Sequence, residues 1–211
     1  MITVLMATWQ GAAYVREQID SILTQTKPID RLLISDDGSA DGTLAILDED
    51  QAEYPDLIEV LRHDGQSDHG TLNGAAANFF FLMEQERARL PVEPGSDDAN
   101  YWFLSDQDDI LAADKVEKMC CKMGEEIEVV GAGEAILLYS DVKVVDGDKK
   151  VLSDSLFRYQ RMDPERTEFS EVLVENPVTG GAAMFNESLL RLIDPVPAFC
   201  VMHDWWLALV A

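Results

Sequence analysis

The first half of the chain alternates short apolar runs with amphipathic stretches, and this alternation restricts the fold more than any other feature. The apolar runs are residues 2–7, 31–35, 57–61 and 101–105. Residues 15–23 have the spacing of one helical face, and residues 44–51 and 75–89 are expected as two further helices. Strands separated by helices of this length form βαβ units. The expected fold class is therefore α/β, with a mostly parallel central sheet and helices on both faces.

The pattern changes after residue 115, where the segments become shorter and less regular. We expect a helix at residues 115–126 and a final helix that begins at His203. Short strands are expected at residues 135–139, 142–145 and 151–152, a glycine-bearing strand at 178–185, and solvent-exposed loops at 94–98 and 158–168. These short strands predict a small antiparallel region beside the parallel sheet. No linker interrupts the chain, so we expect one domain over residues 1–211.

The charge balance excludes one class of partner and restricts another. The 211 residues include 16 basic and 40 acidic side chains, for a net charge of −24. Such a surface repels phosphate backbones, so nucleic-acid binding is not expected. A pyrophosphate ligand would need a local cation to enter. Cys120, Cys121 and Cys200 show no metal-ligand spacing and are expected to be reduced thiols in a cytoplasmic protein.

Three of the four strands in the first half end in polar clusters. These clusters are Thr8-Trp9, Asp36-Asp37 and residues 106–109, which contain three aspartates. In a parallel sheet, ligands bind at the carboxyl ends of the strands. The sequence therefore predicts one ligand site that is built from all three clusters.

Each acidic cluster has two interpretations when it is taken alone. Asp106, Asp108 and Asp109 could hold Mg²⁺ or Mn²⁺, or they could form a solvated helix N-terminus. Asp36-Asp37 could accept a hydrogen bond from a nucleobase or a ribose, or it could belong to an ordinary turn that follows the strand. These alternatives stay open from the residues alone.

Asp204 also has two interpretations. It could be the cap of the last helix, or a general base whose pKa is raised by burial beside neighbouring tryptophans.

Several strings spread over almost the whole chain occur in one order. They are LMATWQGAAYVREQIDSILTQT, LLISDDGSADGT, NGAAANFFFLM, FLSDQDDI, VTGGAAMF and HDWW. In these strings the chain resembles the inverting glycosyltransferases of family 2, which adopt the GT-A fold. The HDWW and NFF elements look most like the rhamnosyltransferase-type members that build bacterial surface polysaccharides.

The resemblance implies a donor site in residues 1–110, the half expected to bind a nucleotide sugar. Thr8 and Trp9 would line the nucleobase pocket, where Asp37 would bind the base with Asp36 nearby. The two acids of the family's DXD motif are Asp106 and Asp108. Asp106 would face the ribose or the metal, and Asp108 would coordinate Mg²⁺ or Mn²⁺ at the donor's phosphates.

The resemblance places the acceptor and the catalytic base in residues 111–211. Asp204 matches the family's catalytic base. Gly180 and Gly181 would let the donor sugar and the acceptor approach the backbone closely, and His203 and Trp205 would complete this site. We expect the C-terminal helices that often complete the acceptor site to be cut off here.

The implied function is metal-dependent inverting transfer of a sugar such as rhamnose. The donor would be dTDP- or UDP-linked and the acceptor a saccharide or a lipid-linked saccharide. The expected location is the cytoplasm, or the inner face of the membrane if missing sequence provides contact. Two alternatives remain: a nucleotide-sugar-binding domain without turnover, and an aspartate-dependent sugar phosphatase. The phosphatase would need a catalytic lysine at a later strand end, which the sequence does not provide.

Overall fold

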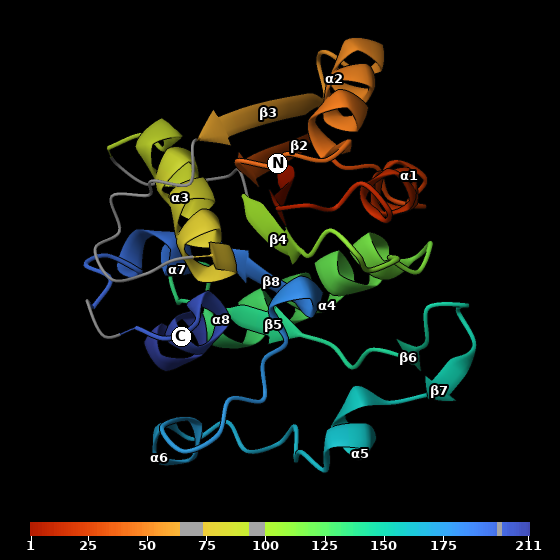
Figure 1. Ribbon diagram of the computed structural model, residues 1–211. Helices are drawn as coiled ribbons and strands as arrows, with labels where there is room; N and C mark the ends of the chain where they lie inside the picture. Colours follow the sequence, from red (N-terminus) through yellow and green to blue (C-terminus); the bar gives the residue numbers. More distant parts are fainter. Residues whose placement is uncertain (64–73, 93–99, 198–199) are drawn as a thin grey trace.

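The fold is centred on a six-stranded sheet, seen in a computed structural model that describes residues 1–63, 74–92, 100–197 and 200–211. Its strands are β1 (Ile2–Thr8), β2 (Arg31–Asp37), β3 (Ile58–His63), β4 (Tyr101–Ser105), β5 (Leu137–Tyr139) and β8 (Ala183–Asn186). They are arranged in the order β3-β2-β1-β4-β8-β5 (Figure 1). Strands β1 to β4 are parallel, and β8 is antiparallel to both of its neighbours. The predicted mostly parallel sheet is confirmed.

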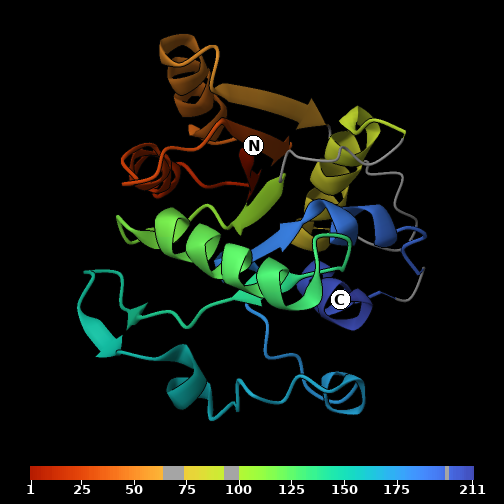
Figure 2. The same cartoon turned by 180° about the vertical axis from the view of Figure 1, so that it is seen from behind.

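Helices cover both faces of the sheet. They are α1 (Val15–Leu23), α2 (Thr43–Glu53), α3 (Gly74–Arg89), α4 (Lys115–Val130), α7 (Glu187–Leu192) and α8 (His203–Val210). Successive side chains of a strand point to opposite faces. Along β1, Val4 and Met6 pack with α1, α2 and α4, whereas Leu5 and Ala7 pack with α3, α7 and α8 (Figures 1 and 2). Because both faces are covered, β1 is buried along its whole length.

Residues 140–176 form a segment that we call the arm. It contains β6 (Val144–Val145), β7 (Val151–Ser153), α5 (Leu156–Gln160) and α6 (Phe169–Val172), and it lies to one side of the sheet in both views (Figures 1 and 2). Strands β6 and β7 are antiparallel. An ion pair between Lys149 and Glu17 ties the arm to α1. The indole of Trp205 in α8 donates to the carbonyl of Val172 at 2.6 Å.

Two sequence-based boundaries in the second half are wrong. The glycine-bearing strand begins at Ala183, because Gly180–Ala182 forms a 3₁₀ turn packed against side chains of other elements. The loop expected at residues 158–168 begins inside α5, where the Ser155 hydroxyl caps the helix by accepting from the Arg158 backbone N–H. The loop expected at residues 94–98 lies outside the described residues.

The acidic pair Asp36-Asp37 belongs to a strand and not to the turn that follows it. Its two residues pair in register with Arg62 and His63 of β3. The alternation of a strand therefore sends the two carboxylates in different directions.

Candidate functional site

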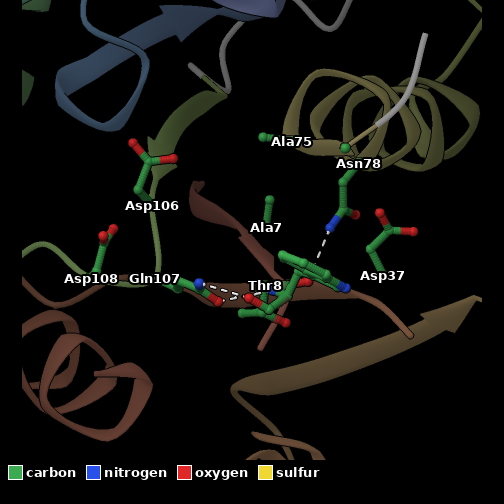
Figure 3. A pocket seen from close by; sticks show the side chains of 10 residues that line it. Ala7, Thr8, Asp37, Ala75, Asn78, Asp106, Gln107 and Asp108 are labelled. Atoms are coloured by element: carbon green, nitrogen blue, oxygen red, sulfur yellow. Dashed lines mark hydrogen bonds between the residues drawn. The ribbon is translucent and has the colours of Figure 1, made fainter. Parts of the chain in front are cut away.

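A cavity of about 540 Å³ opens at the carboxyl ends of β1, β2 and β4. Its lining consists of residues Ala7, Thr8, Trp9, Asp37, Gly74, Ala75, Asn78, Asp106, Gln107 and Asp108 (Figure 3). The chain builds the sheet outward from β1 in one direction through β2 and β3, and then in the other direction through β4. Ligands bind at such a switch point, and pockets for small ligands commonly measure about 300–1,000 Å³.

The two neighbouring aspartates of β2 do different things. Asp36 is 1% exposed and does not line the cavity. Its carboxylate accepts from the Thr8 hydroxyl at 2.8 Å, from the Ser39 N–H at 2.8 Å and from the Ser39 hydroxyl at 2.7 Å. Asp37 is partly exposed and does line the cavity. Asp36 therefore fixes the end of β1 and the turn after β2, and Asp37 is the carboxylate that faces the cavity.

Asn78, in the first turns of α3, is a lining residue to which sequence reasoning assigned no role. Its amide donates to the carbonyl of Ser35 at 2.9 Å. It also donates to the carbonyl of Thr8 at 3.4 Å (Figure 3). These bonds join α3 to the ends of β1 and β2, so the helix start is held over the cavity. A polar residue within the apolar string AAANFFF was the signal that could have identified it.

Gln107 is a second lining residue that sequence reasoning left without a role. It stands between the two aspartates of the DXD motif, and its amide exchanges two hydrogen bonds with the backbone of Trp9. The only sequence signal was its position inside the motif.

The carboxylates after β4 face the cavity from the side opposite Asp37. Figure 3 shows Asp106 and Asp108 together on this side. Burial, together with the nearby carboxylates of Asp109, Asp108 and Asp204, raises the pKa of Asp106 to about 7. Negative charge is thus accumulated here beyond what the surroundings stabilise, and a cation would relieve it.

The donor set for such a cation is incomplete by itself. Within the described residues, no group of three or more His, Cys, Asp or Glu side chains is arranged to hold a metal ion. Mg²⁺ and similar ions commonly bind through one or two carboxylates and take their other ligands from phosphates and water. Asp106 and Asp108 fit this mode of binding, in which the ion arrives with a phosphorylated ligand.

Two consecutive glycines lie between the acidic loop and the start of α8. A Cβ on Gly181 would lie 2.7 Å from Asp106 Oδ2 and 2.6 Å from Asp109 Oδ2. A Cβ on Gly180 would lie 3.4 Å from Asp204 Oδ2, and the Gly180 N–H donates to the same oxygen at 3.1 Å. Because neither position carries a side chain, the acidic loop packs against one glycine of this turn and Asp204 packs against the other.

Asp204 is not the cap of α8. The residue at the cap position is Met202, and Asp204 lies inside the first turn, where it is 9% exposed. Burial raises the pKa of its carboxyl group, although hydrogen bonds from the backbone N–H groups of Trp205 and Gly180 act in the opposite direction. A carboxylate with a raised pKa is a stronger proton acceptor, as a general base requires.

His203 and Trp205, the two expected acceptor-site side chains, do not line the cavity. The His203 ring is buried and stacks on Phe79 of α3 with a centroid distance of 4.1 Å. Burial lowers its pKa to about 3, so the ring is neutral near pH 7. In the described part of the chain neither ring nitrogen has a hydrogen-bond partner, and Nε2 faces Gly180. The Trp205 indole is directed toward the arm.

Comparison with known proteins shows which family the chain is similar to. Residues 3–78 match the sequence profile described as Glycosyl transferase family 2. The chain is 35% identical over 112 residues to the dTDP-rhamnosyl transferase RfbG of Shigella flexneri, an alignment that covers 53% of this chain and 34% of that protein. It is 23% identical over 203 residues to an uncharacterised glycosyltransferase of Nostoc, with 92% of this chain and 54% of that protein covered. The chain thus spans about a third to about half of these relatives.

Solved structures share the fold. TarS 1–349 of S. aureus in complex with UDP superposes with a TM-score of 0.62 at 17% identity, over 98% of this chain and 53% of that one. The mannosyltransferase PcManGT of Pyrobaculum calidifontis, in complex with GDP-Man and Mn²⁺, gives a TM-score of 0.60 at 16% identity, over 97% and 49%. The profile and the relatives show that the chain is similar to glycosyltransferase family 2, and the solved structures show that it has the GT-A fold.

Proposed function

We propose that the chain is the donor-binding and catalytic part of a metal-dependent inverting glycosyltransferase. The observation that carries the proposal is the arrangement of carboxylates: Asp37 lines one side of the cavity, and Asp106 and Asp108 line the other. Asp204 lies outside the lining, across the Gly180–Gly181 turn from Asp106. In this proposal residues 1–110 bind the nucleotide sugar, and residues 111–211 provide the base and the acceptor side.

The donor would lie along the cavity from Asp37 to Asp108. The carboxylate of Asp37 would accept from the imide N–H of uracil or thymine, next to Thr8 and the exposed indole of Trp9. The pyrophosphate would lie at Asp106 and Asp108. When bound there, Mg²⁺ or Mn²⁺ supplies the positive charge that stabilises a diphosphate leaving group. The Mn²⁺ in the mannosyltransferase of the same fold supports metal use and does not distinguish the two ions.

Transfer would be a single displacement. Asp204 would take the proton of an acceptor hydroxyl while that oxygen forms a bond to the anomeric carbon. The bond from the anomeric carbon to the donor phosphate breaks on the opposite face, so the nucleoside diphosphate leaves and the configuration inverts. Gly180 and Gly181 would provide room for the sugar and the acceptor. Trp205 would lie on the acceptor side, where its bond to Val172 joins α8 to the arm.

We extend the proposal to the donor sugar and the acceptor. Similarity to the dTDP-rhamnosyl transferase supports a dTDP-linked rhamnose, with a UDP-linked sugar as the alternative. The acceptor would be a saccharide or a lipid-linked saccharide of a surface polysaccharide, reached in the cytoplasm or at the inner face of the membrane. None of the helices that the structure describes is long and apolar enough to cross a bilayer.

Titration calorimetry with UDP and dTDP, each with and without Mn²⁺, tests the donor site. At least one nucleotide should bind, and Mn²⁺ should strengthen its binding. Asp108→Asn should remove the effect of Mn²⁺ and leave metal-free binding intact. A thermal-shift measurement gives an independent readout, because a ligand at about 100 times its dissociation constant adds about 2.7 kcal/mol of stability. Negligible heats in all four titrations would refute the proposal.

A second candidate is a domain that binds the donor without efficient transfer. It is favoured by the two expected acceptor-site side chains, His203 and Trp205, neither of which lines the cavity: the first stacks on Phe79 and the second bonds to Val172. Mass spectrometry of the products formed from dTDP-rhamnose and a saccharide acceptor separates the two candidates. A metal-dependent glycoside product supports the enzyme, and tight nucleotide binding without product supports the silent domain.

A further inference from the structure

The end of β1 continues beyond the strand that pairs with it. Pairing between β1 and β4 ends at Met6 and Ser105. Three residues later, the Trp9 N–H donates to Gln107 Oε1 at 2.9 Å, and Gln107 Nε2 donates to the Trp9 carbonyl at 2.9 Å. A side-chain amide carries one acceptor and two donors, so it can replace the peptide group of a neighbouring strand. The Gln107 side chain thus continues the hydrogen bonding along β1 beyond the end of β4.

Gly11 provides the space in which the Gln107 amide lies. A Cβ on Gly11 would lie 2.2 Å from Oε1 and 2.6 Å from Cδ of Gln107. The backbone of Gly11 is not in the left-handed region, so the requirement at this position is for space and not for conformation. Its N–H is fixed by the Thr43 hydroxyl at 2.8 Å. Gly11 and Gln107 therefore form a matched pair, although 96 residues separate them in the sequence.

Trp9, the residue that Gln107 holds, is positioned mainly through its backbone. The Trp9 side chain lines the cavity and is 59% exposed. So exposed an indole receives little support from packing, and a fixed backbone reduces the entropy that it loses on binding a ligand. An amide provides this support without adding charge to a loop that already carries Asp106 and Asp108.

We infer that Gln107 is a positioning residue that holds Trp9 at the nucleobase end of the cavity and thereby sets the affinity for the donor nucleoside. The inference rests on the proposed donor site. It assigns the middle residue of the DXD motif to the base and not to the metal, so one short loop serves both ends of the donor. The indole would then stack on the base, an interaction that tolerates different bases because each has a flat face.

Calorimetry with UDP and dTDP, in EDTA and in Mn²⁺, tests the assignment. Gln107→Ala should weaken the nucleotide by about tenfold, the equivalent of about 1.4 kcal/mol, in both conditions. Gln107→Glu should weaken it at least as much, because a carboxylate oxygen would face the Trp9 carbonyl. Asp108→Asn should weaken binding only when Mn²⁺ is present. A loss for Gln107→Ala that appears only with Mn²⁺ would overturn the assignment to the base, as would an unchanged affinity.

A double-mutant cycle separates the pair from a general loss of structure. Gly11→Ala should lower both nucleotide affinity and melting temperature, because the new methyl group displaces the Gln107 amide. In Gly11→Ala/Gln107→Ala the displaced atoms are gone, so the double variant should match Gln107→Ala alone. Additive losses would refute the pairing. The melting temperatures test the pairing even if the wild type binds neither nucleotide, an outcome that would refute the proposed function instead.

Gln25 provides a matched control. Its side-chain amide also bonds to backbone groups, donating to the carbonyls of Ser21 and Ala112 and accepting from the Val116 N–H. It does not line the cavity. Gln25→Ala should lower the melting temperature and leave nucleotide affinity unchanged. If Gln25→Ala weakens the nucleotide as much as Gln107→Ala does, the effect of Gln107 is one of stability and the inference fails.

Discussion

Replacing each of the adjacent aspartates Asp36 and Asp37 with alanine should produce opposite phenotypes. Asp36 is buried and serves three donors, whereas Asp37 is partly exposed and lines the cavity. We expect Asp36→Ala to destabilise the fold and Asp37→Ala to weaken the nucleotide while the fold remains stable.

The loss of stability expected for Asp36→Ala follows from the donors that the substitution leaves without an acceptor. Removing its carboxylate leaves the Thr8 hydroxyl and the Ser39 N–H as buried donors without their acceptor. Each unsatisfied group costs about 1–3 kcal/mol, so the free energy of unfolding should fall by about 2–6 kcal/mol. A loss of about 4 kcal/mol lowers the melting temperature of a chain of this size by about 8–16 °C. For Asp37→Ala the loss should stay below about 1 kcal/mol.

Urea denaturation followed by circular dichroism measures the two stabilities, and calorimetry at low temperature measures UDP and dTDP affinity. Asp37→Ala should weaken the nucleotide by about tenfold or more, because the hydrogen bond would be made to a charged acceptor. Similar stability losses in the two variants would refute the assignment of Asp36 to the fold. An unchanged affinity in Asp37→Ala would remove Asp37 from the donor site.

Three further predictions concern the acidic loop and the start of α8. Asp204→Asn should slow nucleoside diphosphate release in the presence of acceptor by about 10²–10⁴-fold and leave donor affinity unchanged. Undiminished turnover would exclude Asp204 as the base. Gly181→Ala should weaken Mn²⁺-dependent nucleotide binding by calorimetry, because its methyl group would displace the carboxylates of Asp106 and Asp109. The control Gly124→Ala, where a Cβ meets nothing within 4 Å, should leave binding unchanged and add about 1 kcal/mol of helix stability. Because the pKa of His203 is lowered from 6.5 to about 3, the unfolded state binds the additional proton, and stability should fall as the pH drops below about 6.5. Between pH 7 and pH 5, the free energy of unfolding of His203→Phe, measured by urea denaturation, should fall by about 2 kcal/mol less than that of the wild type. Identical losses in the two proteins would contradict the burial of a neutral ring.

The sequence by itself determined the elements of the sheet and the edge at which the site lies. Residues 101–105 were expected as a strand and form β4 with the same bounds, because a short buried strand is defined by its own apolar side chains. The helix α1 was likewise visible in local periodicity. The polar residues that end β1, β2 and β4 had to meet because parallel strands place their carboxyl ends together.

The tertiary structure alone decided which polar side chain does what. Asp36 and Asp37 are equivalent in the sequence, and pairing with β1 and β3 sends one into a buried network and the other to the cavity. Gln107 meets Trp9 across 98 residues, and Gly180 meets Asp204 across 24. Such contacts depend on how strands and helices pack, and local periodicity carries no information about them. The sequence thus determined at which edge of the sheet the cavity lies, and packing determined which carboxylates and amides line it.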